Sequence, residues 1–264
     1  MTQEKKVAVV TGSSSGIGYE ITARLLLLGY TVYGLSRRGT VPEGAHGLKA
    51  DVSKKNEVDE AVNTVIDNEG RIDILIANAG MGISGPVEFT AQDAMEKITE
   101  INFYGQVYSS QAVLATMRKQ GNGHVIFISS VAAPIAIPYQ GFYSATKSAV
   151  CSIALALRNE VKDFNIKVTC IQPGDCSTGF TDSREKNQNY DDIYTANSKA
   201  TMSMEKDERE GIPAHKAAKQ IVDIALKENP KPIYIIGFKY KLFALLFRIL
   251  PARLSYTIVS HMYG

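Results

Sequence analysis

Short apolar runs alternate along the chain with longer segments in which apolar residues recur at helical spacing. The runs predict strands at 7–10, 31–35, 47–50, 72–77, 124–128, 166–171 and 232–236. The helical spacing predicts helices at 19–28, 56–68, 91–117, 142–162 and 213–227. Strands that are apolar on both faces are typical of a parallel sheet covered by helices. With right-handed crossovers, this alternation predicts an α/β fold, in which a single doubly wound (Rossmann) parallel sheet has helices on both faces and residues 1–264 form one domain.

Two segments break this alternation. Residues 179–211 are polar and lack a clear apolar stripe, and a loop of this length in a compact domain predicts a functional segment, here a substrate lid. Residues 238–264 are apolar with a few basic residues, and three interpretations are open: a helix packed over the pocket, a subunit contact, or an amphipathic element on a membrane. We favour burial or a subunit contact, as in a homodimer or homotetramer, over membrane contact, because large exposed apolar patches are uncommon on soluble monomers.

Composition and charge narrow the function classes. The net charge is +2, from 29 basic and 27 acidic residues, so no nucleic-acid partner is expected. The three cysteines form no CxxC pair and no cluster with histidine, so no metal site is expected. The first residues lack the apolar stretch of a signal peptide, and no apolar run reaches the roughly 20 residues that span a bilayer. These features favour a cytoplasmic protein with reduced thiols.

A glycine-rich loop, Thr11–Gly18, joins the first predicted strand to the first predicted helix. Glycines here let the backbone turn tightly and approach a pyrophosphate, to which the amino end of the helix offers N–H donors. A glycine triplet alone is weak evidence, because turns also use glycine, but the strand–loop–helix context strengthens it. The GxxxGxG spacing resembles that of the short-chain dehydrogenase/reductase family, and the candidate cofactor-binding residues are Gly12, Ser14, Ser15, Gly16, Ile17 and Gly18.

The end of the second predicted strand, Ser36-Arg37-Arg38, indicates which nicotinamide cofactor binds. NAD enzymes usually carry an acidic residue here, which binds the ribose 2′-hydroxyl. This chain has no carboxylate at that place; Ser36 can donate a hydrogen bond to a 2′-phosphate, and Arg37 can make a charge-assisted contact with it. The alternative is a pair of solvated surface arginines. We favour the phosphate, and therefore NADP(H) as the cofactor.

Tyr143 and Lys147 form a YxxxK motif on a predicted helix, where a spacing of four places both side chains on one face. An unperturbed tyrosine, with a pKa of about 10, is a poor base at neutral pH. A nearby ammonium and the charge of oxidised nicotinamide favour the phenolate, so we expect the pKa of Tyr143 to fall and the residue to act as general acid and base. Ser130 lies at a strand end, where its hydroxyl can stabilise developing negative charge, and Ser129 competes for this role.

The resemblance to the short-chain dehydrogenase/reductase family extends over Thr11–Thr178 and implies further roles. It implies that Ser130 is catalytic and Ser129 structural, and that Asn102 lies at a helix kink holding a water of a proton relay to the lysine. It also implies that Asp51 binds the adenine amino group and that Thr178 binds the nicotinamide carboxamide. The other cofactor-binding residues that it implies are Val52, Asn78, Ala79, Gly80, Tyr143, Lys147, Pro173 and Gly174.

The function implied by the resemblance is NADP(H)-dependent interconversion of a ketone and a secondary alcohol, with Tyr143 as the proton carrier. The expected pocket is formed by apolar residues of the loops after the strands, namely Met81, Ile83, Val131, Ile135, Ile137, Tyr139 and Phe142. This lining favours a hydrophobic ketone or alcohol, and a looser resemblance to 17β-hydroxysteroid and retinol dehydrogenases suggests a steroid, a retinoid or another lipid. Two alternatives are open: a catalytically silent cofactor-binding regulatory protein, and a reductase of small or acyl-chain carbonyls.

Overall fold

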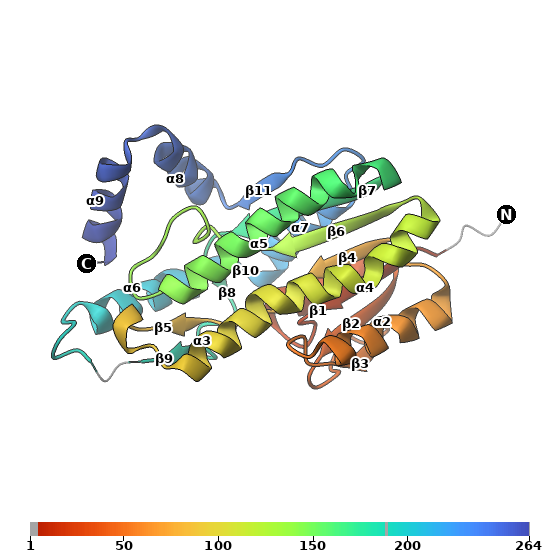
Figure 1. Cartoon of the computed structure of the whole chain (residues 1–264), viewed down its shortest axis with the longest axis horizontal. Helices are drawn as coiled ribbons and strands as arrows, with labels where there is room; N and C mark the ends of the chain where they lie inside the picture. Colours follow the sequence, from red (N-terminus) through yellow and green to blue (C-terminus); the bar gives the residue numbers. More distant parts are fainter. Residues whose placement is uncertain (1–4, 188–189, 264) are drawn as a thin grey trace.

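The computed structural model describes residues 5–187 and 190–263, and a seven-stranded sheet forms its centre (Figure 1). The strand order is β11-β7-β6-β4-β1-β2-β3, and all neighbouring pairs are parallel. The chain winds outward in both directions from β1 and β4, which confirms the doubly wound α/β fold and places the ligand crevice at the carboxyl ends of these strands. The strands are β1 Val7–Thr11, β2 Thr31–Ser36, β3 His46–Lys49, β4 Ile74–Ala77, β6 Gly123–Ile128, β7 Ile166–Pro173 and β11 Ile233–Ile236.

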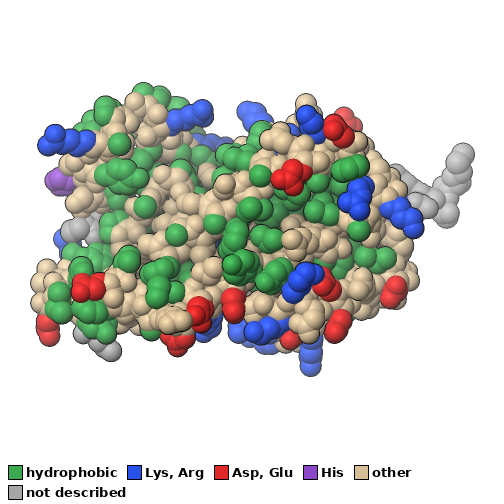
Figure 2. Space-filling view, viewed as in Figure 1, with side chains coloured by type: hydrophobic (Ala, Val, Ile, Leu, Met, Phe, Trp, Pro, Cys, Tyr) green, Lys and Arg blue, Asp and Glu red, His purple; other side chains and the backbone are tan. Residues whose placement is uncertain are grey.

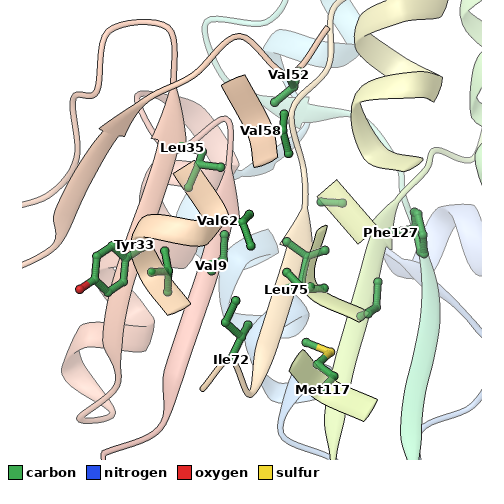
Figure 3. Close-up of a cluster of buried hydrophobic side chains, with 14 of the residues drawn as sticks. Val9, Tyr33, Leu35, Val52, Val58, Val62, Ile72, Leu75, Met117 and Phe127 are labelled. Atoms are coloured by element: carbon green, nitrogen blue, oxygen red, sulfur yellow. The ribbon is translucent and has the colours of Figure 1, made fainter. Parts of the chain in front are cut away.

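Alternating strand residues divide the core between the two faces of the sheet. Val9 and Leu75 belong to the cluster drawn in Figure 3, whereas their neighbours Val10 and Ile76 belong to a second cluster on the opposite face. Truncating a fully buried side chain such as Leu75 to alanine costs about 2–5 kcal/mol, so both faces hold the sheet in place. The first cluster is covered by α2 Lys55–Glu69, α4 Gly105–Gln120 and α5 Gly141–Glu160, and the second by α1 Gly16–Leu27 and α7 Ala214–Ala225.

The edge strand β3 does not fit the prediction that all strands are apolar and buried on both faces. That prediction holds for the inner strands β1, β4, β6 and β7, but three of the four residues of β3 are exposed. The reason is position, because β3 pairs only with β2 at the end of the sheet. Shorter strands form two small pairs near the carboxyl ends: β5 Ile83–Ser84 with β9 Glu185–Lys186, and β8 Cys176–Ser177 with β10 Ile212–Pro213.

The helix predicted at 91–117 is present as three consecutive segments. α3 (Gln92–Thr99) passes into a π-helical turn over Glu100–Tyr104, and α4 continues from Gly105. A π-helical turn contains an extra residue per turn and is frequent at functional sites. The turn surrounds Asn102, which is fully buried.

The polar segment 179–211 is more regular than its sequence predicts. It contains α6 (Asn197–Arg209), and one side of this helix is buried through Ala200, Thr201 and Met204. The expectation that the segment lacks a packing face was wrong, because small and polar residues form most of that face and do not stand out in a hydrophobic pattern. The segment therefore has its own packed helix, whereas its role as a lid stays a prediction.

The carboxyl-terminal residues form two helices, α8 (Phe238–Ile249) and α9 (Ala252–Tyr263). Figure 1 shows them apart from the sheet, at the same end of the molecule as α6, and α9 contacts α6. Ser255 and Val259 of α9 are buried, but α8 has no buried residue, so the expected burial of the tail holds only in part. None of the described helices combines the length and apolar character needed to cross a membrane.

Candidate active site

The glycine-rich loop lies between β1 and α1 with the geometry that its sequence predicts. Gly12 and Gly16 have positive φ angles of 70° and 56°, which favour glycine. At Gly18 a Cβ atom would lie 2.3 Å from the carbonyl oxygen of Gly12, so no side chain fits there. No side-chain hydrogen bond from Ser15 caps α1. The first N–H groups of α1 are therefore able to bind a pyrophosphate, as expected for a dinucleotide site.

The two arginines after β2 have different surroundings. Both are exposed, and the Arg38 guanidinium donates to the Ser14 hydroxyl of the glycine-rich loop at 3.3 Å. The Ser36 hydroxyl is buried and accepts a hydrogen bond from the Gly39 N–H at 3.0 Å. The sequence analysis assigned the phosphate contact to Arg37, but in the structure it is Arg38 that reaches the loop. Within the described residues, Arg37 makes no side-chain hydrogen bond. Two cations therefore follow β2, and Arg38 lies against the glycine-rich loop.

The Asn78-Ala79-Gly80 segment ties the end of β4 to the end of β1. The N–H groups of Asn78 and Ala79 both donate to the Thr11 hydroxyl, at 2.9 and 3.0 Å, and the Asn78 amide donates to the Thr11 carbonyl at 3.0 Å. These contacts hold the two strand ends together, whereas the expected cofactor contact of the segment stays a prediction. Thr11 was not among the predicted site residues, and the only sequence signal for it was its place at the start of the glycine motif.

Asp51 and Val52, after β3, make mainly local contacts. The Asp51 carboxylate accepts from the backbone N–H and the hydroxyl of Ser53, at 3.0 and 2.9 Å. Val52 is buried against Gly105, where an added Cβ atom would lie 2.9 Å from the valine side chain. These contacts fix the loop beside the crevice, and the adenine contact of Asp51 stays a prediction.

Asn102 is held at the π-helical turn by three hydrogen bonds. Its side-chain oxygen accepts from the Met81 N–H at 2.7 Å, and its amide donates to the Met81 carbonyl at 2.9 Å and to the Thr146 hydroxyl at 3.3 Å. The structure thus has a π-helical turn where the resemblance implies a kink, and the water of the proton relay stays a prediction. At Gly80 a Cβ atom would lie 3.3 Å from the Asn102 oxygen and 3.4 Å from Lys147 Nζ, so both groups border the same small space.

Ser130, Tyr143 and Lys147 come together at the carboxyl end of β6. A side-chain hydrogen bond links Tyr143 to Ser130. Lys147 Nζ lies 5.8 Å from the centroid of the Tyr143 ring and donates to the Ile128 carbonyl at 2.9 Å. The hydroxyl of Ser129 instead donates to the backbone carbonyl of Lys147 at 2.7 Å. The geometry thus separates the two serines, with Ser130 at the tyrosine and Ser129 in the framework.

Burial dominates the electrostatics of this group. Desolvation raises the pKa of Tyr143 to about 12, although the Ser130 hydrogen bond acts in the opposite direction. Desolvation also lowers the pKa of Lys147 to about 8. Among the protein's own residues, burial of the phenol therefore dominates the pKa of Tyr143, and its expected lowering beside Lys147 and an oxidised nicotinamide stays a prediction. At neutral pH Tyr143 is a protonated acid.

The loop after β7 connects the cofactor crevice to the carboxyl-terminal helices. Val131 N–H donates to the Pro173 carbonyl at 3.0 Å, which aligns the loops after β6 and β7. A Cβ atom on Gly174 would lie 2.0 Å from the Tyr240 ring, and one on Gly16 would lie 3.4 Å from Thr178. Thr178 therefore lies beside the glycine-rich loop, and its expected nicotinamide contact stays a prediction.

Comparison with known proteins agrees with this geometry. Residues 6–189 match the family model described as short chain dehydrogenase. The chain belongs to the short-chain dehydrogenase/reductase family. A short-chain dehydrogenase from Streptomyces avermitilis has the same fold, with a TM-score of 0.83, 26% identity and 99% of both chains covered.

Two curated relatives are named for lipid substrates. The 3-ketodihydrosphingosine reductase of Bacteroides thetaiotaomicron is 41% identical over 235 residues, which cover 86% of each chain. The NADPH-dependent 1-acyldihydroxyacetone phosphate reductase of Saccharomyces cerevisiae is 32% identical over 250 residues, covering 88% of this chain and 83% of the yeast protein. A short-chain dehydrogenase fold, a glycine-rich loop and a Ser–Tyr–Lys group thus occur together in a protein whose relatives include lipid reductases.

A cavity of about 150 Å³ lies between the catalytic loops and the carboxyl-terminal helices. Val131, Ile135 and Ile137 line it as predicted, but Met81, Ile83, Tyr139 and Phe142 are not among its lining residues. Ile83 is instead buried in β5. The tail supplies much of the remaining wall, which agrees with the interpretation of residues 238–264 as a helix packed over the pocket, although no individual tail residue was predicted to line it: Lys239, Tyr240, Leu242, Phe243, Leu246 and Met262.

Three charged groups line this cavity, two carboxyls and one ammonium: Asp175, Asp207 and Lys239. Lys239 Nζ lies 3.9 Å from Asp207. Asp175 also lines the cavity and accepts a hydrogen bond from the Tyr240 hydroxyl, which carries no charge. Burial raises the pKa of Asp175, whereas the Tyr240 hydrogen bond and the charge of Lys239 lower it. The cavity wall therefore has one more carboxyl group than it has cations.

Proposed function

We propose that the chain is an NADPH-dependent reductase of a ketone carried by a long-chain lipid. The observation that carries the proposal is the Ser130–Tyr143–Lys147 group. None of the three residues lines the apolar cavity, but its wall begins at Val131, which follows Ser130 in the chain. The relatives named for ketodihydrosphingosine and acyldihydroxyacetone phosphate support an open-chain lipid over the steroid or retinoid that the sequence suggests.

The residues divide the chemistry between them. NADPH supplies the hydride when bound, and the glycine-rich loop and the Asn78–Gly80 segment border its site. Tyr143 donates the proton to the carbonyl oxygen, since its raised pKa keeps the phenol protonated at neutral pH. Ser130 holds that oxygen by a hydrogen bond and stabilises its developing charge. Lys147 binds the ribose and stabilises the phenolate that forms, and Asn102 links the lysine to solvent through a water.

NADPH is preferred over NADH in this proposal because of the charges after β2. No carboxylate is present there to repel a 2′-phosphate, and the exposed side chains of Arg37 and Arg38 flank its place. A relative named as NADPH-dependent supports this preference. Arg38 joins Arg37 as a candidate contact of the 2′-phosphate, because its hydrogen bond to Ser14 holds its guanidinium against the glycine-rich loop.

The charge of the cavity favours a neutral or cationic lipid over an anionic one. Asp175 and Asp207 share a single lining cation, Lys239, and a substrate ammonium beside Asp175 would supply a second. A phosphate at the same place would meet a like charge. Ketodihydrosphingosine, a long-chain base with an amino group next to its ketone, has the matching charge. We therefore propose a long-chain amino ketone as the preferred substrate class.

NADPH oxidation with a panel of ketones tests the proposal. The panel contains a long-chain 2-amino-3-ketone, the corresponding neutral ketone, an acyldihydroxyacetone phosphate and a steroid ketone. We expect the protein to reduce both the amino ketone and the neutral ketone. The kcat/KM should be higher for the amino ketone. Turnover of the steroid alone, or binding of NADPH without turnover of any ketone, would overturn the proposal; the second result would favour a silent cofactor-binding protein.

A further inference from the structure

One face of α8 is apolar and open to solvent. Its residues follow helical spacing along a single stripe, and they are among the most exposed large apolar side chains of the described residues. The exposed fractions are 85% for Phe238, 52% for Leu242, 53% for Leu245, 45% for Leu246 and 70% for Ile249. A contiguous exposed stripe of this kind on a helix that contributes nothing to the core indicates a docking surface.

The charges around this stripe have one sign. The segment 238–264 contains Lys239, Lys241, Arg248 and Arg253, and no aspartate or glutamate. It thus holds four of the 29 basic residues of the chain and none of the 27 acidic ones, so residues 1–237 carry 25 basic against 27 acidic side chains. In the space-filling view, green and blue side chains occupy the surface over α8 and α9 at the upper left, without red ones (Figure 2).

We propose that α8 lies flat on an anionic lipid bilayer, with its apolar stripe in the headgroup region and its basic residues at the phosphates. A helix of 12 residues is about 18 Å long, which suits an interfacial element and not a membrane span. A second copy of the chain fits this face less well, because pairing two such tails would bring together two sets of four basic residues with no acidic partner.

The position of the stripe connects the bilayer to the cavity. Leu242, Leu246 and Met262 are exposed and also line the cavity beside the catalytic loops. A lipid in the bilayer would therefore meet the cavity wall at the membrane surface. This last step rests on the proposed lipid substrate, whereas membrane contact itself depends only on the apolar and basic surface.

Sedimentation of the full chain with lipid vesicles tests the proposal. We expect binding to vesicles that contain phosphatidylglycerol, weaker binding to pure phosphatidylcholine, and loss of binding as salt is raised. The double variant Leu245→Glu/Ile249→Glu should not bind, because it places charge in the stripe at positions outside the cavity. Lys241→Ala and Arg248→Ala should each weaken binding by roughly fivefold. Leu27→Glu, at an 86% exposed leucine of α1, is the matched control and should bind as the wild type does.

Two further measurements keep the test independent of folding and of turnover. The thermal midpoint of unfolding shows whether each variant is folded. Oxidation of NADPH with a water-soluble ketone shows whether each variant is active. If the proposed function is wrong, the activity measurement fails, whereas the folding control and the vesicle binding still hold. Wild-type protein that stays in the supernatant with anionic vesicles would overturn membrane docking. So would unchanged vesicle binding by Leu245→Glu/Ile249→Glu, or a dimer in solution that this variant converts to a monomer.

Discussion

Arg37 and Arg38 show how two adjacent residues of one type acquire different tasks. Arg38 reaches the glycine-rich loop through Ser14, and Arg37 stays exposed beside it. A charge-assisted hydrogen bond is worth about 1.5–3 kcal/mol, which corresponds to about a ten- to hundredfold change in binding. We expect Arg37→Ala/Arg38→Ala to lower kcat/KM for NADPH by about this factor and to leave NADH almost unaffected. Ser36→Asp should add repulsion. A wild type that uses NADH equally well would contradict the phosphate assignment.

Asp175 determines the charge preference in the proposed reaction. Asp175→Asn removes the carboxylate and keeps a side chain that can still bond to Tyr240. We expect the KM for a long-chain amino ketone to rise by about tenfold and the KM for the matching neutral ketone to stay constant, because only the first has an ammonium to pair. Asp182→Asn, at an exposed aspartate paired with Arg209, is the control. An equal effect on both ketones would indicate that Asp175 acts only on the structure of the loop.

At the scale of elements, His124 joins three of them. Its ring nitrogens hydrogen-bond the Ala225 carbonyl of α7 and the Thr169 hydroxyl of β7, both at 2.9 Å, from β6. Burial lowers the pKa of His124 to about 4 from an ordinary value of 6.5. The unfolded chain therefore binds a proton between these values while the folded chain does not, so the free energy of unfolding falls as pH decreases through this window.

The size of this effect is measurable by urea unfolding above and below the window. The pKa difference corresponds to at most about 3 kcal/mol for complete protonation. His124→Gln should lose that part of the pH dependence, and His215→Gln, at an exposed histidine of α7, should retain it. Identical pH dependence in wild type and His124→Gln would show that this histidine is not responsible.

The segment 179–211 is predicted to open and close as a unit. Thr181 and Arg184 both bond to Glu208 of α6, and Lys186 pairs with Glu205, so the start of the segment is fastened to its helix. We expect hydrogen exchange of α6 to be faster than that of β4 in the free protein and to slow when NADPH and a lipid ketone bind, because α6 buries little apolar surface. Exchange in α6 that is equally slow with and without ligands would contradict the lid.

Most of the fold and of the cofactor crevice could be predicted from the sequence because their signals are local. The strand runs, the glycine-rich loop and the Tyr143–Lys147 spacing each lie within a few residues, and the sheet topology brings their ends together. The packing of α6 and the tail could not be predicted in this way. Their contacts join residues far apart in the chain, as Tyr240 joins Asp175, and small or polar residues form much of the buried side of α6.

The whole molecule places its motifs at one edge of a sheet. The motifs between Thr11 and Thr178 lie at the carboxyl ends of the strands. The carboxyl-terminal helices form one wall of the cavity beside them. Burial of Tyr143 at this edge raises its pKa and keeps the phenol protonated. The central claim is therefore that Tyr143 is the proton donor for the reduction of a lipid ketone.

The most direct test compares the wild type with Tyr143→Phe, using NADPH and a long-chain ketone, with Tyr108→Phe of α4 as the control. Loss of the proton donor should lower kcat by about 10²–10⁴ while NADPH binds with nearly unchanged affinity, because only the hydroxyl is removed. Tyr108→Phe should behave as the wild type does. A Tyr143→Phe protein that binds NADPH and keeps most of its turnover would contradict the account.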